Sequence, residues 1–147
     1  MTNGIRPSLV SLLRVAVVSA ALAACPLSQA AEGTVVYHIN DSASAAALLV
    51  NVGNHLAAAP DNRIHVVSHG RGIDFLLREA RDGNGEIYAN KVKVLADKGV
   101  QFKVCRNTLR GRKLDDNAVE VGVIVVPAGV VEIARLQLEE KAAYIKP

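Results

Sequence analysis

The amino-acid sequence predicts an α/β protein with a parallel sheet covered by helices on both faces. Short apolar segments alternate along the chain with segments whose apolar residues recur at helical spacing, and this alternation is typical of parallel α/β folds. Half of the residues are hydrophobic, but only 3% are aromatic and Trp is absent. The core must therefore be aliphatic, which suits a buried parallel sheet. A chain of 147 residues fits a single domain with one core.

Five apolar segments are expected to form strands. The first four are almost entirely apolar, which indicates strands that are buried on both faces. The last is short and is expected at an edge of the sheet. The predicted strands are 34–39, 64–67, 101–105, 121–126 and 143–145.

Helical spacing of apolar residues predicts the helices between these strands. In the segment 42–58, Leu48 and Val52 share one face, and polar side chains before it can cap its start. Pro127 fits the first turn of the last helix. The segment 107–117 is basic and irregular, with room for one helical turn. The other predicted helices are 73–80, 88–98 and 130–140.

Residues 1–30 have the features of an export signal. Two arginines precede a short apolar segment, 15–24, and a small-residue cleavage site follows at 28–30. The apolar segment is too short to span a bilayer, and a buried N-terminal helix is the alternative interpretation. Cleavage at this site leaves one domain, 31–147, which is expected in the periplasm.

A second processing route is indicated by Leu22–Cys25, which resembles the lipobox of bacterial lipoproteins. Cleavage before Cys25 would leave a lipidated cysteine at the new N-terminus. The protein would then be anchored to a membrane and face the periplasm. Without this lipid no membrane contact is expected.

The charge of the chain argues against nucleic acid as a partner. The formal net charge is +3, but Arg6 and Arg14 lie in the predicted signal, and no acidic residue precedes Glu32. The remaining domain is therefore close to neutral. It has no basic cluster with interleaved aromatic residues, which nucleic-acid binding would favour.

Chemically versatile residues follow the predicted strands. Ligands of open α/β sheets bind beyond the carboxyl ends of the strands, so these residues are expected along one edge. They are His38, Asn40 and Asp41; Ser68, His69 and Gly70; Cys105, Arg106, Asn107 and Thr108; and Pro127, Ala128 and Gly129.

Cys105 is the strongest candidate for a catalytic residue. By either processing route it is the only cysteine of the domain 31–147. A cysteine without a partner in an exported protein suggests a reactive or intermolecular thiol. Nearby cations favour the nucleophilic thiolate. An inert, buried cysteine beside a solvated basic loop is the alternative. The cations are Lys103, Arg106, Arg110, Arg112 and Lys113.

The histidines have several interpretations. His69 is expected to pair with Cys105, to donate to a bound group or to cap the next helix. A cluster of His38, His69 and Cys105 suits a soft metal, but nothing in the spacing demands one. His65 is expected to be a satisfied core or surface residue, and His55 to face solvent. Because CxxC, GxGxxG and Walker-type motifs are absent, we expect no cofactor and no metal.

Four segments together resemble the DsrE/DsrF-like family, also called the YchN-like family, over residues 33–147. The resemblance implies a flavodoxin-like three-layer αβα domain that assembles into trimers or hexamers. Better-known members are sulfur-relay proteins whose single cysteine at this strand end carries sulfur as a persulfide, and Cys105 is the matching position. The segments are 35–39, 64–70, 99–109 and 126–137.

The export signal departs from the pattern of the known relay proteins, which act in the cytoplasm with dedicated partner subunits. The expectation is therefore an exported sulfur carrier, rather than a turnover enzyme, with a sulfur donor or acceptor protein as partner. His69, His38, Asn107 and Arg106 are expected to bind the substrate or an anion. The alternatives are an oligomeric module that binds a small ligand or metal, and a thiol redox sensor.

Overall fold

The computed structural model of the chain describes Met1 and residues 32–147. Nearly all of the predicted signal segment, including the lipobox at Cys25, lies outside the described residues. Among the residues described, no helix is both long and apolar enough to cross a membrane.

Five parallel strands form one sheet in the order β4-β3-β2-β1-β5. All five predicted strands are present, which confirms the predicted fold class. The strands are β1 (Thr34–Ile39), β2 (Arg63–Ser68), β3 (Gln101–Cys105), β4 (Ile124–Val126) and β5 (Ala143–Ile145).

The fourth strand is shorter than predicted. The sequence predicts strand from residue 121, but β4 begins at Ile124 because Gly122 has a left-handed backbone (φ +86°). Regular strand does not include this conformation. Apolar composition alone cannot reveal such a turn.

Helices fill the connections between the strands. Each predicted helical segment contains helical structure, although the bounds differ. The α-helices are α1 (Ala45–Ala58), α2 (Tyr88–Ala96), α3 (Arg106–Gly111) and α4 (Gly129–Glu139), and the 3₁₀ helices are η1 (Ser42–Ser44), η2 (Gly70–Leu76) and η3 (Asp116–Ala118).

Two helix predictions need correction. The helix predicted over 73–80 is the 3₁₀ helix η2, which begins and ends earlier, because Leu77 turns extended and bridges to Val119. Pro127 does not lie in the first turn of α4, since Ala128 is the N-cap and the helix begins at Gly129.

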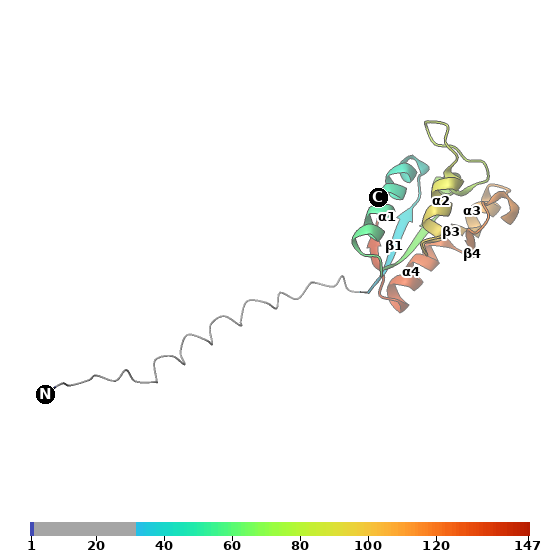
Figure 1. The fold of residues 1–147 in the computed structure, drawn as a ribbon. Coiled ribbons are helices and arrows are strands. Elements are labelled where there is room, and N and C mark those ends of the chain that lie inside the picture. The colour runs from blue at the N-terminus through green and yellow to red at the C-terminus, as the bar shows by residue number, and fades with distance from the viewer. Residues whose placement is uncertain (2–31) are drawn as a thin grey trace.

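The two faces of the sheet carry cores of different size. The larger core lies between the sheet and the elements α1, η2 and α2. The smaller core lies under α4, which packs on β1, β2 and β3 apart from the other helices (Figure 1). The smaller core consists of Val36, Val67, Ile133, Leu136 and Ala142.

The smaller core leaves polar residues of β3 under α4. Side chains alternate between the two faces of a strand, so Gln101, Lys103 and Cys105 share the face that α4 covers. Lys103 is buried there and bonds to Glu132 of α4. The same face therefore carries both the candidate cysteine and a buried cation.

Candidate functional site

The carboxyl edge of the sheet brings Cys105 and His69 to the same glycine. Cys105 ends β3, and His69 follows β2. A Cβ atom on Gly129, at the start of α4, would lie 3.2 Å from the Cβ of Cys105 and 3.4 Å from the Cβ of His69. Real Cβ contacts are rarely that close, so the missing side chain lets α4 approach both residues.

The sulfur of Cys105 is a buried, free thiol surrounded by hydrogen-bond donors. The residue is only 5% exposed. Burial would raise the pKa of Cys105, but the N–H of Gly129, the N–H and hydroxyl of Thr108 and the N–H of Asn107 outweigh it and lower the pKa below its ordinary value. Donors of this kind favour the thiolate.

Thr108 ties two loops of this edge together. Its Oγ1 accepts a hydrogen bond of 3.0 Å from the N–H of Gly70, and its hydroxyl acts on Cys105. Gly70 has a left-handed backbone (φ +57°) that suits glycine. The hydroxyl of Thr108 is therefore directed to the sulfur by the loop that follows β2.

Three of the five cations near Cys105 in the sequence pair with carboxylates. Lys103 bonds to Glu132, Arg106 to Asp116 and Arg112 to Asp74. The pKa of Cys105 is thus lowered by backbone amides and the hydroxyl of Thr108, rather than by the cations expected from the sequence.

Asn107 and Arg106, the two other predicted anion ligands near Cys105, differ in their contacts. Asn107 contributes its backbone N–H to the sulfur. The guanidinium of Arg106 lies 2.7 Å from the carboxylate of Asp116, and both side chains are partly exposed to solvent. Asn107 therefore belongs to the sulfur site, and Arg106 is held at its margin.

His38 and His69 form a directly bonded pair. Their Nε2 atoms lie 2.7 Å apart and their rings stack with centroids 4.8 Å apart. The Nδ1 of His38 bonds to the hydroxyl of Tyr144 in β5 at 2.6 Å. Tyr144 can donate to His38 while His38 donates to His69, or both bonds can run in reverse. The three side chains therefore form a chain along which protons can be relayed.

The environment of this pair favours the neutral form of both rings. Burial lowers the pKa of His38, with smaller effects from His69 and Lys146, and burial and Lys146 lower the pKa of His69. The pair can therefore donate a neutral N–H to a bound group. It does not supply the positive charge expected for an anion site.

The remaining histidines differ from their predicted roles. His55 does not simply face solvent, because its Nδ1 lies 3.0 Å from the hydroxyl of Tyr37 and its Nε2 lies 2.9 Å from Asn62. His65 is buried as expected for a core residue, but no atom of residues 32–147 forms a hydrogen bond with either ring nitrogen. The burial was predicted correctly, but the expected hydrogen-bond partner is not supplied by the described protein residues.

The metal cluster considered for His38, His69 and Cys105 is not assembled. Within residues 32–147, no group of three or more His, Cys, Asp or Glu side chains lies close enough together to hold a metal ion. The two histidines bond to each other instead.

The profile of the DsrE/DsrF-like family matches residues 27–147. This match covers most of the chain. The chain belongs to the DsrE/DsrF-like family. The family is associated with sulfur relay. The matched residues include all of the site residues described above.

Solved structures of DsrE/DsrF-like relatives support the fold. A protein of unknown function from Methanobacterium thermoautotrophicum, MTH1491, is 36% identical, with a TM-score of 0.71 over 79% of this chain and 100% of its own. The YchN protein of E. coli is 15% identical, with a TM-score of 0.62 over 80% of this chain and 100% of its own. No curated protein sequence matches significantly.

The sequence did not reveal that three groups contribute to the site of this DsrE/DsrF-like protein. The hydroxyl of Thr108, the amide of Gly129 and the hydroxyl of Tyr144 all act at this edge. Thr108 and Gly129 do follow predicted strands, so their position carried a signal. Tyr144 lies in an edge strand whose neighbour in the sheet is far away in sequence, and no local pattern identifies that neighbour.

Proposed function

We propose that the protein is a sulfur carrier in which Cys105 holds a sulfur atom as a persulfide. The observation that carries the proposal is the set of donors on the Cys105 sulfur, which lowers its pKa against the effect of burial. The membership of a family associated with sulfur relay supports the same role.

The proposed reaction is a sulfur transfer without net oxidation. The Cys105 thiolate attacks the outer sulfur of a donor persulfide. A new S–S bond forms at Cys105, the donor's S–S bond breaks, and the donor leaves as a thiolate. The proton of the donor's S–H group stays on the transferred sulfur. Transfer to an acceptor thiolate repeats this exchange in the other direction.

The amide donors suit both stages of this exchange. They favour the attacking thiolate, and they remain available to a persulfide anion on the same residue. When His38 donates to His69, the pair can offer one neutral N–H at the same edge, that of His69 Nδ1. We propose that these two side chains, with Asn107, hold the incoming sulfur, and that Arg106 assists from the margin.

We further propose that the domain is exported and acts in the periplasm, by cleavage near residue 30 or as a lipoprotein anchored at Cys25. The support is the signal-like sequence of residues 1–30. The family profile begins to match only at residue 27, which suits a leader that is not part of the domain. The donor and acceptor would then be periplasmic thiols or proteins.

Mass spectrometry tests the carrier proposal. The protein is incubated with polysulfide, and the peptide containing Cys105 is examined for added sulfur. One added sulfur atom on Cys105 is expected, with none in a Cys105→Ser variant, and dithiothreitol should remove it. If Cys105 gains no sulfur while it can still be alkylated, the carrier proposal is wrong.

The low exposure of Cys105 favours a second candidate, a binding module in which the thiol is structural. Such a module would keep its ligand binding in the Cys105→Ser variant, whereas a carrier would lose all transfer. A redox sensor is a third candidate, and it would form an intersubunit disulfide visible on non-reducing gels. Burial of Cys105 opposes that disulfide unless the edge opens.

A further inference from the structure

A polar cavity lies on the α4 face of the sheet, at the end opposite Cys105. Its volume is about 330 Å³, and it is lined chiefly by Arg63, His65, Gln101, Lys103, Arg135 and Glu140. Arg63 and Gln101 open β2 and β3, so the cavity lies at the amino ends of the strands. Its size suits a small ligand rather than a single water molecule.

His65 is the unexplained group in this cavity. It is only 7% exposed, yet within the described part of the chain neither ring nitrogen has a hydrogen-bond partner. The nearest carboxylate oxygen, from Glu140, is 3.9 Å from Nε2, which is beyond hydrogen-bond range. Two unpaired buried nitrogens are costly, so a partner is expected from the cavity itself.

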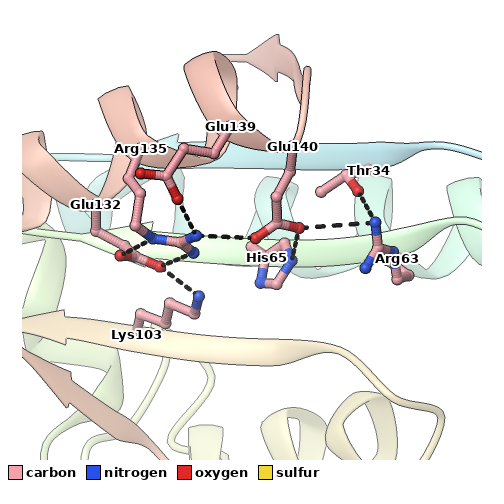
Figure 2. A network of polar contacts seen from close by, with 8 residues as sticks. All are labelled: Thr34, Arg63, His65, Lys103, Glu132, Arg135, Glu139 and Glu140. Atoms are coloured by element: carbon pink, nitrogen blue, oxygen red, sulfur yellow. Dashed lines mark hydrogen bonds and ion pairs between the residues drawn. The ribbon is translucent and has the colours of Figure 1, made fainter.

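The carboxylates around His65 are already engaged. Glu132 accepts bonds from Lys103 and from two nitrogens of Arg135. Glu140 accepts from Arg135 through Oε1 and lies 3.7 Å from Arg63 through Oε2 (Figure 2). The guanidinium of Arg135 is shared among three carboxylates. Little acceptor capacity is left for a ligand.

The cations around His65 retain unused donors. Lys103 carries three N–H groups, and among residues 32–147 its only partner is Glu132. Arg63 donates one bond, to the hydroxyl of Thr34, and its side chain is 70% exposed at the mouth of the cavity. His65 adds at least one N–H. The unsatisfied capacity of the cavity is therefore mainly that of donors.

We propose that this cavity binds a small oxyanion, such as a carboxylate or sulfate-like group, which accepts hydrogen bonds from His65, Lys103 and Arg63. The site is separate from the sulfur chemistry of Cys105. A bound oxyanion would give His65 a hydrogen-bond partner. It would also accept from the N–H groups that Lys103 and Arg63 leave unused.

Binding of an anion would change the protonation of His65. Burial lowers the pKa of His65, and the charges of Lys103 and Arg63 lower it further, while Glu140 and Glu132 act in the opposite direction. A bound anion would offset the two cations and stabilise the imidazolium. The pKa of His65 should therefore rise when the ligand is present.

NMR titration of the histidine rings tests the proposal with the wild-type chain. Sulfate and acetate are added separately, with sodium chloride at matched ionic strength as the control. We expect a saturable shift of the His65 ring signals and a raised pKa of His65 with one or both anions. The ring signals of His55, on the opposite face of the sheet, should not change.

Two variants distinguish a site from general attraction by charge. Arg63→Gln removes an exposed donor at the mouth and should weaken binding about three- to tenfold. Arg110→Gln removes an exposed arginine of α3, at the other end of the sheet, and should leave binding unchanged. Equal weakening by both variants would overturn the proposal.

Two other outcomes would also overturn the proposal. If chloride shifts His65 as much as sulfate and acetate do, the effect is screening alone. If the His65 signals depend on protein concentration and respond to neither anion, a second copy of the chain covers the cavity instead.

Discussion

The sulfur of Cys105 is activated by groups that carry no net charge. Three backbone N–H groups and the hydroxyl of Thr108 act on it, and their combined effect exceeds that of burial. Amides at the start of α4 and α3 are fixed by the helices that contain them, so they need little reorganisation when the thiolate forms. A flexible lysine or arginine could not be held so closely at equal entropic cost.

Removing the hydroxyl of Thr108 should slow the reactions of Cys105. In Thr108→Val the side chain keeps its shape but loses its donor, so the thiolate fraction should fall. We expect alkylation of Cys105 at neutral pH to become about tenfold slower, measured with iodoacetamide. Thr108→Ser keeps a hydroxyl and should react almost as fast as the wild type. Equal rates for the two variants would show that the hydroxyl does not act on the sulfur.

The histidines whose pKa values are lowered should make the fold sensitive to acid. The pKa values of His38, His65 and His69 are all lowered in the folded protein, chiefly by burial. The unfolded chain therefore binds protons first, and the free energy of unfolding should fall as the pH drops below about 6.5. Urea unfolding at a series of pH values checks this. The dependence should weaken in the double variant His38→Gln, His69→Gln, and stability that stays constant down to pH of about 5 would contradict it.

Helix α4 connects the two ends of its sheet face through charged side chains. Its first residue, Gly129, packs against Cys105. Glu132, in its first turn, bonds to the buried Lys103, and Glu140, at its C-cap, lies near Arg63 and His65 (Figure 2). Arg135 and Lys103 together lower the pKa of Glu132 to about 2. The buried pair of Lys103 and Glu132 is thus central to the packing of α4.

Removing Glu132 should destabilise the fold strongly. Glu132→Gln leaves the ammonium of Lys103 buried without its counter-charge, and we expect a loss of about 3–5 kcal/mol in the free energy of unfolding, measured by urea denaturation. The exposed pair of Lys93 and Asp97 is the matched control, so Asp97→Asn should cost less than about 1 kcal/mol. Similar losses from both variants would show that the buried pair contributes no more to the free energy of unfolding than an exposed pair does.

Periodic and apolar patterns were sufficient to predict the elements of this fold. Each strand is a local feature, and parallel α/β alternation leaves few topologies. The errors lie where a single backbone angle decides, as at Gly122, or where contacts distant in sequence decide, as at Leu77, which bridges to Val119.

The candidate site was predictable in position but not in detail. The carboxyl edge of a parallel sheet is a general property, so Cys105 and His69 were expected together. The direct bond between His38 and His69, and the contact of Gly129 with Cys105, depend on how α4 and β1 pack across the edge. That no residue within 32–147 pairs with His65 is likewise a property of tertiary packing.

Several large apolar side chains on α4 and β4 are exposed in the single chain. Val130, Val131 and Leu138 of α4 and Ile124 of β4 are all exposed. Contiguous exposed apolar surface commonly marks contact surfaces. We propose a homo-oligomer, either a trimer or a hexamer. Contacts between copies of the chain would then bury further apolar surface on the side of the sheet that α4 covers.

Charged substitutions on α4 should dissociate this oligomer. We expect the wild-type protein to sediment as a trimer or hexamer, and Val131→Lys or Leu138→Lys to shift it toward the monomer without loss of helical content. Val50→Lys, on α1 and the opposite face, is the control and should not change the mass. A wild-type protein that is monomeric at micromolar concentration would contradict the proposal.

The alkylation rate of Cys105 as a function of pH tests the central claim most directly. If donors on the sulfur stabilise the thiolate, the rate should rise with an inflection clearly below the pKa of a free thiol, about 8.5. The low exposure of Cys105 lowers the alkylation rate by the same factor at every pH, so the pH of the inflection does not change. An inflection at or above that of a free thiol would show that burial outweighs the donors, and Cys105 would not be the nucleophile of a sulfur carrier.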